Sequence, residues 1–263
     1  MDAGPPRTTQ TGSTRDGRPP LSAVLKETLR DGKHFFVVKT APYYAVFNKT
    51  DIASEAVGDL LDHLDAVTSA ARLLKNGRTC FVTSVRWNSR DYVIKRYNPK
   101  GLLHSLRHTL KRSRARHGWL DAHRLLYLGI PTPRPVGFIE EYSGLLLKRA
   151  WLITELAPGP KLHDYLADPA ITDAQKADTL DKVRRILDLL GQNRITHGDL
   201  KHVNLIVTPD GPTLIDLDSL KIHRTGLFYP HHRKKDLVAF DFPAHKQTKM
   251  DSIIIGNYAP KKH

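Results

Sequence analysis

The stretch 195–220, which reads ITHGDLKHVNLIVTPDGPTLIDLDSL, constrains this chain more than any other. Two short apolar runs in it, 205–208 and 213–217, read as buried strands joined by a Pro-Asp-Gly turn. A hairpin brings its two ends together. We therefore expect Asn204, just before the first strand, to lie beside Asp216, near the end of the second.

A third oxygen-bearing side chain, Asp199, lies in the loop that leads into this hairpin. Three such groups converging on one point suit a hard cation such as Mg²⁺, with one carboxylate left to act on a substrate proton. The alternative is an ordinary solvated loop rich in turn residues. The spacing and the hairpin together favour the site.

The pattern H-x-D-x-K-x-x-N, followed by an Asp on a second strand, resembles the catalytic and metal-binding segments of protein-kinase-like phosphotransferases. The resemblance implies that Asp199 orients the attacking hydroxyl and accepts its proton. Asn204 and Asp216 would then hold Mg²⁺, and Lys201 would lie near the transferred phosphate.

The charge balance points to an anionic partner. Of the 263 residues, 41 are Lys or Arg and 27 are Asp or Glu, which gives a net charge of +14. Nucleic acid, an acidic membrane surface or a phosphorylated substrate would each fit. The single cysteine, Cys80, excludes an intramolecular disulfide and a cysteine-based zinc site, and it fits a reducing compartment.

The N-terminal residues 1–20 are polar and rich in Gly, Pro and Thr, and we expect them to be a disordered tail. They contain no apolar core typical of a secretory signal. No apolar run approaches the roughly 20 residues that span a bilayer. A cytoplasmic protein, peripheral at a membrane surface, is the expected location.

Residues 34–39 and 43–48 read as two strands, belonging either to an extra sheet or to an extension of the first lobe. Residues 60–74 have apolar side chains at roughly helical spacing. A strand at 71–74 is the alternative for the end of that segment.

Residues 81–85 and 92–97 read as two further strands around a turn. Lys95 follows Val-Ile on the second strand, much as the nucleotide-binding lysine follows V-A-I on a kinase strand. An outward-facing strand lysine is the alternative. Just before these strands, Gly77 is the only glycine available for a loop whose N–H groups could cover phosphates.

Residues 96–118 contain seven Lys or Arg, three His and no acid. Leucines recur there at helical spacing, which predicts a basic helix at about 101–117 followed by a core helix at about 119–128. We expect Arg107, Lys111 and Arg114 to bind an anion, with lipid phosphates, a phosphorylated sugar and RNA as candidates. A plain solvated helix face is the alternative.

An apolar strand at 151–156 leads into Ala-Pro-Gly. In a kinase-like fold this is the hinge between lobes, where the backbone near Glu155 and Leu156 would meet adenine and Thr154 would guard the back of the pocket. The clearest helix, 172–190, begins with a capping-box pattern and ends at a glycine.

Only 45 residues follow Asp218, too few for a full protein-kinase activation loop and helical lobe. Within them, 231–240 is basic and then apolar. Asp236 there could accept hydrogen bonds from the backbone of the His197-Gly198 loop and brace it. The alternative is an ordinary helix N-terminal Asp.

Taken with further matching residues, these motifs resemble the Kdo/heptose lipopolysaccharide kinase family over roughly residues 70–245. The further residues are Arg112-Ser113-Arg114-Ala115-Arg116, Trp119, Ala122-His123-Arg124-Leu125, Gly129-Ile130-Pro131-Thr132-Pro133, Ile153-Thr154-Glu155-Leu156, Ile215-Asp216-Leu217-Asp218 and Lys235-Asp236-Leu237.

The resemblance implies an α+β, bilobal protein-kinase-like fold with a small β-rich N-lobe (21–153) and a short, mostly helical C-lobe (154–263). The C-lobe would carry a catalytic loop at 197–204 and a metal-binding strand at 213–218. ATP with Mg²⁺ and a sugar hydroxyl of the lipopolysaccharide inner core are the implied substrates, met at the cytoplasmic face of the inner membrane. An anionic glycolipid fits the basic charge, which leaves nucleic acid the less favoured partner.

One departure from the kinase pattern concerns the acid that usually pairs with the strand lysine. No Glu occurs between Lys95 and Phe138, and Gly118 stands about where better-known members carry it. Asp121 is the only acid in the neighbouring helix. Either Asp121 substitutes, or Lys95 is held otherwise, or activity is reduced.

Two other functions compete with a lipopolysaccharide kinase. The same chemistry could serve another acceptor, either a soluble small molecule or a protein as in RIO-type kinases. The missing Glu and the poor glycine loop would also suit a pseudokinase or a basic binding module, although such a module has no need for Asp199, Asn204 and Asp216 together.

Overall fold

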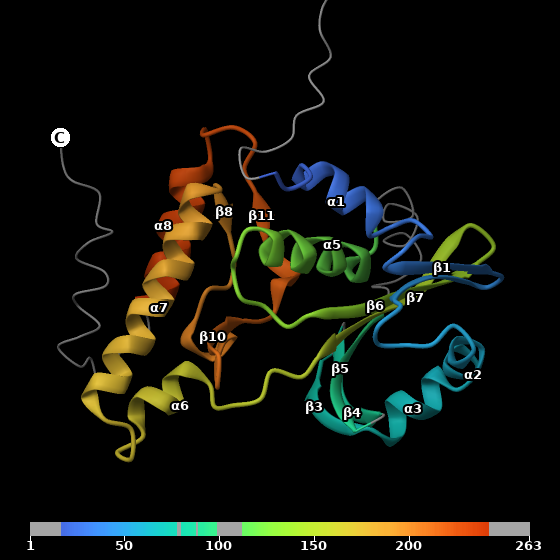
Figure 1. The fold of residues 1–263 in the computed structure, drawn as a ribbon, viewed down its shortest axis with the longest axis horizontal. Helices are drawn as coiled ribbons and strands as arrows, with labels where there is room; N and C mark the ends of the chain where they lie inside the picture. Colours follow the sequence, from blue (N-terminus) through green and yellow to red (C-terminus); the bar gives the residue numbers. More distant parts are fainter. Residues whose placement is uncertain (1–16, 78–79, 88, 99–111, 242–263) are drawn as a thin grey trace, which may run out of the picture.

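The computed structural model, which describes residues 17–77, 80–87, 89–98 and 112–241, combines one large sheet with a helical part. The sheet is antiparallel and its strands lie in the order β1-β2-β6-β7-β5-β4-β3 (Figure 1). In chain order these strands are β1 (Phe35–Thr40), β2 (Tyr43–Asn48), β3 (Arg72–Asn76), β4 (Cys80–Trp87), β5 (Arg90–Tyr97), β6 (Pro135–Ser143) and β7 (Leu146–Glu155).

Helices cover both faces of this sheet. In Figure 1, α1 (Leu21–Glu27) and α5 (Arg114–Tyr127) lie on one side of it, and α2 (Ala56–Asp62) and α3 (Leu64–Ala70) on the other. Because successive strand side chains point to opposite faces, neighbouring apolar residues separate into two cores. Leu152 packs with Trp119 of α5, whereas the next residue, Ile153, packs in the core that contains α2 and α3.

The strands predicted at 34–39 and 43–48 extend this same sheet rather than forming another one. The helical segment predicted at 60–74 falls into two helices, and its last residues form β3, which was the alternative for them.

Helix α5 contains the predicted core helix and the last residues of the predicted basic helix. Residues 101–111 lie outside the described part of the chain. From Arg114 the helix runs unbroken to Tyr127, and the Ser113 hydroxyl caps it by accepting from the Arg116 N–H at 3.0 Å. The described helix therefore continues through Gly118. The glycine does not end the helix there; it allows α5 to pack closely against the sheet.

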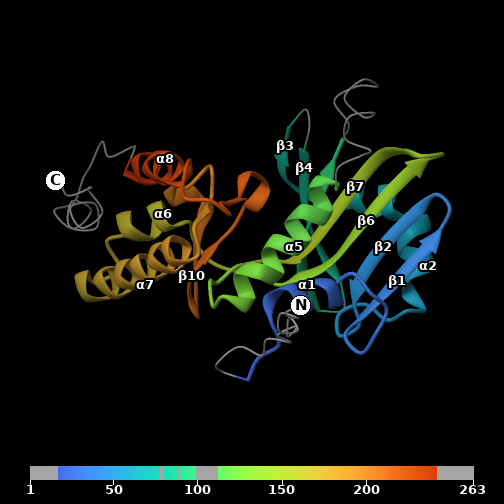
Figure 2. The ribbon, with the colours of Figure 1, turned by 90° about the horizontal axis from the view of Figure 1, so that it is seen from above.

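The C-terminal part gathers α6 (Leu162–Ala167), α7 (Asp173–Gln192) and α8 (Tyr229–Asp241) at one end of the molecule, away from the sheet (Figure 2). Two small pairs of strands complete it, β9 (Leu205–Thr208) with β10 (Gly211–Leu214) and β8 (Ile195–Thr196) with β11 (Lys221–Ile222). The capping box predicted for α7 is present, since Thr172 and Gln175 bond each other's backbone.

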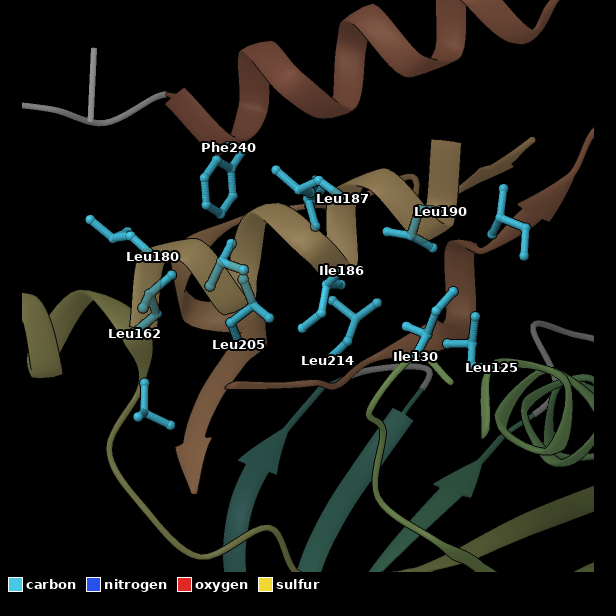
Figure 3. Close-up of a cluster of buried hydrophobic side chains, with 14 residues drawn as sticks. Leu125, Ile130, Leu162, Leu180, Ile186, Leu187, Leu190, Leu205, Leu214 and Phe240 are labelled. Atoms are coloured by element: carbon cyan, nitrogen blue, oxygen red, sulfur yellow. The ribbon is translucent and has the colours of Figure 1, made fainter. Parts of the chain in front are cut away.

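A separate apolar core holds this part together (Figure 3). Leu180 and Leu187 of α7 pack with Leu205 and Leu214 of the hairpin, and Phe240 of α8 lies over them. This core fixes the hairpin, and with it the residues at the two ends of the hairpin, on a rigid helical base. No helix in the described ranges is long and apolar enough to cross a membrane.

Candidate active site

Asp199, Lys201 and Asn204 form one connected group before the hairpin. The Asn204 amide nitrogen donates to the Asp199 carbonyl oxygen at 2.8 Å and to Asp199 Oδ2 at 3.2 Å. Lys201 Nζ lies 2.6 Å from Asp199 Oδ1. Asn204 is buried, whereas the Asp199 side chain keeps 44% of its surface exposed, so the loop is anchored from below and its carboxylate is partly open to solvent. Since the side-chain nitrogen of Asn204 is used internally, its side-chain oxygen Oδ1 is the atom left for a cation.

Asp216 lies at the other end of the hairpin. The Ile215 N–H donates to the Asn204 carbonyl oxygen at 2.9 Å, which joins the two ends of the hairpin as its geometry predicts. Asp216 itself adopts the left-handed conformation, with φ 62° and ψ 57°. For this reason the second strand ends at Leu214 and not at 217 as predicted. A left-handed backbone is uncommon for a residue other than glycine, and such residues cluster at functional sites.

Lys95 of β5 reaches across to this segment. Its Nζ lies 2.6 Å from Asp216 Oδ1 and 3.4 Å from Asp218 Oδ1, and the side chain is 17% exposed. Burial alone would lower the pKa of Lys95, but the carboxylates of Asp218 and Asp216 outweigh it and the pKa is raised. Burial likewise works against the charge of Asp216, and the Lys95 ammonium outweighs it and lowers the pKa of that carboxyl.

Asp218 is the centre of a second set of contacts. Its Oδ1 also accepts from the Tyr97 hydroxyl at 2.7 Å, and its Oδ2 accepts from the Arg114 guanidinium at 2.7 Å. That guanidinium lies over the Tyr97 ring, 4.6 Å from its centroid. Burial and the Asp218 charge raise the pKa of Tyr97 well above its usual value. Asp218 thus ties β5, the start of α5 and the segment after β10 together.

Asp121, the acid considered as a substitute for the missing Glu, is paired with another residue. Asp121 pairs with Arg124 at 2.5 Å, one turn along α5. Burial raises the pKa of Asp121 to about 6, despite that arginine. A Cβ at Gly118 would come within 2.7 Å of Leu152 Cδ2, so the position where a Glu was expected is packed against the sheet. In the part of the chain that is described, the carboxylates that form ion pairs with Lys95 are those of Asp216 and Asp218.

Asp236 of α8 lies under the loop that contains Asp199. Its two carboxylate oxygens accept from the N–H groups of His197 at 2.6 Å and Gly198 at 2.8 Å, the contacts expected of it. His197 Nε2 lies 2.9 Å from the Ile215 carbonyl oxygen. Gly198 has a φ of 80°, and a Cβ there would meet the Ser219 carbonyl oxygen at 2.5 Å. The loop therefore requires glycine at this position.

The predicted hinge and glycine turn use their N–H groups within the protein. Glu155 N–H donates to the Arg134 carbonyl oxygen at 3.0 Å, and Leu156 N–H donates to that of Asp91 at 2.9 Å. Thr154 pairs with Val93 of β5 in the sheet. Gly77 N–H donates to the Cys80 carbonyl oxygen at 3.1 Å, across the β3–β4 turn. None of these three N–H groups points to a free ligand position.

The structure brings Lys95, Asp216 and the Asp199 loop to one place between the sheet and the helical part. Arg107 and Lys111 lie outside the described residues, and Arg114 is engaged with Asp218. Tyr97 was not predicted from the sequence, which allowed Asp218 to be either a second metal ligand or only a carboxylate at a strand end. The signal for Tyr97 was its position two residues after Lys95, on the same face of the strand.

No group of three or more His, Cys, Asp or Glu side chains that could hold a metal occurs among the described residues. Asp216 and Asn204 offer one carboxylate and one amide oxygen. That set is sparse for an all-protein site, and it fits a Mg²⁺ ion that takes its other ligands from water and substrate phosphates.

Comparison with known proteins decides the family. A sequence model of the lipopolysaccharide kinase (Kdo/WaaP) family matches residues 64–252, well over half of the chain. The chain belongs to this family. A Kdo/WaaP family member is a phosphotransferase that acts on sugar hydroxyls of lipopolysaccharide, and the chain is a kinase of that kind.

A solved structure supports the fold of this Kdo/WaaP family chain. It is titled "WaaP in complex with acyl carrier protein", and it matches with a TM-score of 0.56 at 19% identity. The match covers 73% of this chain and 80% of that one. The likeness agrees with the kinase-like α+β fold predicted from the sequence. A search of curated proteins gave no match.

Proposed function

We propose that this family member is an ATP-dependent kinase that phosphorylates a hydroxyl of Kdo or heptose in the lipopolysaccharide inner core. The observation that carries the proposal is the pairing of Lys95 with Asp216 beside the Asp199–Asn204 loop. A lysine on a strand, a carboxylate to hold the metal and a carboxylate open to the acceptor are the parts that phosphoryl transfer requires.

In this proposal Asp199 positions the acceptor hydroxyl and takes its proton. Its partly exposed side chain leaves room for a sugar to approach, and the Asn204 amide holds one of its oxygens in place. Lys201, now paired with Asp199 Oδ1, lies where it could turn to the transferred phosphate. Proton transfer by a positioned carboxylate contributes roughly 10²–10⁴-fold to rates in other enzymes.

Asn204 Oδ1 and Asp216 would hold Mg²⁺, and Lys95 would pair with the α- and β-phosphates of ATP. The ion, when bound, neutralises charge that develops on the transferred phosphate. Because the N–H groups of Glu155 and Leu156 already donate to Arg134 and Asp91, adenine would need a carbonyl oxygen of this hinge or an N–H further along. Thr154 would lie behind the base.

Asp218 would take over the role of the missing helix Glu. Lys95 is held on one side by Asp216 and on the other by Asp218. Since Tyr97 and Arg114 fix the Asp218 carboxylate from two further directions, that carboxylate has little freedom to leave the lysine. The acid that positions Lys95 would thus come from the segment after β10 and not from helix α5.

The acceptor would be a lipid-anchored, anionic glycolipid, and the protein would act as a peripheral protein at the cytoplasmic face of the inner membrane. The net charge of +14 supports an anionic acceptor. Arg107 and Lys111 remain candidates for binding it. Arg114 is a weaker one, because its guanidinium already pairs with Asp218.

Transfer of labelled γ-phosphate from Mg·ATP tests the proposal, with an inner-core glycolipid as acceptor. Choline, an aminoglycoside and a generic protein are offered in parallel. We expect label in the glycolipid alone, and its loss in Asp199→Asn while ATP binding persists. Label in another acceptor would reassign the substrate, and transfer that survives Asp199→Asn would remove Asp199 from its role. Failure to bind ATP would favour a basic binding module.

A further inference from the structure

The segment between Asp218 and Asp236 starts and ends at the active site. Asp218 contacts Lys95, and Asp236 accepts from the backbone of the catalytic loop. Between them, residues 219–235 contain five Lys or Arg, three His and no acid. The segment runs through η2 (Leu217–Ser219), β11 and the connection to α8 (Figure 1).

Two large apolar side chains are exposed in the connection between β11 and α8. Leu227 is 77% exposed and Phe228 is 64% exposed. Neighbouring side chains such as Arg224 are also exposed, and Ile222 of β11 is 42% exposed. Neighbouring exposed apolar side chains, unlike a single one, can mark a surface that contacts a partner or a membrane.

Helix α8 continues this surface with basic residues. Asp236 and Phe240 are buried and mark the inner face of the helix. His231, Lys234 and Lys235, together with Val238, are exposed and recur at the spacing of one helix face. We call the exposed set Arg224, Leu227, Phe228, His231, Lys234 and Lys235 the tip surface.

We propose that the tip surface docks on an anionic lipid bilayer and so brings the active site to a membrane-embedded acceptor; this rests on the proposed function. Lys and Arg side chains are attracted to anionic headgroups, and Leu and Phe side chains enter the boundary between headgroups and acyl chains. A nucleic-acid surface would account for the charge, and a base could stack on Phe228, but it would give Leu227 no role. The lipid surface accounts for the charge and for both apolar side chains.

Co-sedimentation with vesicles tests this directly. The probes are vesicles of phosphatidylglycerol and phosphatidylcholine in equal parts, and vesicles of phosphatidylcholine alone. The variants are Leu227→Ser/Phe228→Ser and Lys234→Gln/Lys235→Gln. Leu145→Ser is the matched control, because Leu145 is 87% exposed in the turn between β6 and β7, away from the tip surface. Thermal melting checks that each variant is folded.

We expect the full chain to bind the anionic vesicles, each double variant to bind them about tenfold more weakly, and the control to bind normally. Double variants that bind as tightly as the unsubstituted protein would overturn the proposal. So would double variants that lose affinity only for a single-stranded RNA offered in parallel, since the tip surface would then be a nucleic-acid site.

Kinase assays separate this proposal from the proposed function. Leu227→Ser/Phe228→Ser should transfer phosphate to a water-soluble, deacylated core glycan at the normal rate, but slowly to the same glycan anchored in vesicles. Asp199→Asn should lose transfer and keep its vesicle affinity. If the unsubstituted protein bound vesicles as expected but transferred no phosphate, the proposed function would be wrong, whereas the assignment of the tip surface to membrane binding would remain supported.

Discussion

The ammonium group of Lys95 and the carboxylate of Asp216 lie 2.6 Å apart, although 121 positions separate them in the chain. This ion pair joins β5 of the large sheet to the segment after the β9–β10 hairpin. The same ammonium lies 3.4 Å from Asp218. Two carboxylates thus hold the lysine against the cost of its burial, and neither comes from helix α5.

Asp218→Asn should weaken the hold on Lys95 and lower kcat/KM for ATP by about tenfold, roughly the 1.4 kcal/mol that one charge-assisted hydrogen bond supplies. A double-mutant cycle with Lys95→Met measures the coupling, and strong non-additivity is expected. Arg114→Gln is the matched control, because it contacts the other oxygen of Asp218 and should cost less. Additive effects of Lys95→Met and Asp218→Asn would contradict this role.

Asp236→Ala should loosen the catalytic loop. It leaves the N–H groups of His197 and Gly198 without an acceptor, and since His197 is buried, its unpaired N–H alone costs about 1–3 kcal/mol. Asp236→Asn keeps one acceptor oxygen, so its stability and its transfer rate should lie between those of Asp236→Ala and the unsubstituted protein. Urea unfolding and transfer rates measure both variants. If Asp236→Ala were as stable and active as the unsubstituted protein, Asp236 would be an ordinary helix residue.

Gly198→Ala should reduce both stability and transfer. A left-handed backbone costs a residue with a Cβ about 1–2 kcal/mol, and that Cβ would also press on the Ser219 carbonyl oxygen. Gly226→Ala is the control, because no atom lies within 4 Å of a Cβ built there. Thermal melting of the two variants gives the comparison, and equal effects would show that the Gly198 conformation imposes no constraint.

Asp121 should make stability depend on pH. Its pKa is raised from 3.8 to about 6 in the folded chain, so the folded state binds this proton more tightly than the unfolded state does. Its contribution to the free energy of unfolding therefore falls as pH rises from about 4 to about 6, by up to about 3 kcal/mol. Above that window the loss is complete and constant.

Urea unfolding of the unsubstituted protein and Asp121→Asn, over about pH 4 to 7, measures this contribution as the difference between the two curves. A difference that does not change with pH would contradict the raised pKa. The KM for ATP in Asp121→Asn supplies a second result. We expect it to be unchanged, since Asp121 pairs with Arg124, and a large increase would restore Asp121 as the partner of Lys95.

Much of the site could be predicted because its signals are local. The Pro-Asp-Gly turn fixes the β9–β10 hairpin, and the hairpin joins Asn204 to the residues around Asp216. The Thr172–Gln175 capping box fixes where α7 begins. Each of these depends on residues a few positions apart, so spacing in the sequence is enough to find them.

The order of the seven strands, the two helices on the far face of the sheet and the partners of Asp218 depend instead on contacts between distant segments. The sequence offered Asp121 as a substitute partner for Lys95, and nothing in it indicated that Asp218 would take that place. Packing decides which acid pairs with Lys95. Gly118 of α5 lies against Leu152, and the turn after β10 brings Asp218 to Tyr97 and Arg114. The sequence determined which groups are available, and the tertiary structure decided which charges meet, since a buried ion pair forms only where the fold brings both partners out of water together.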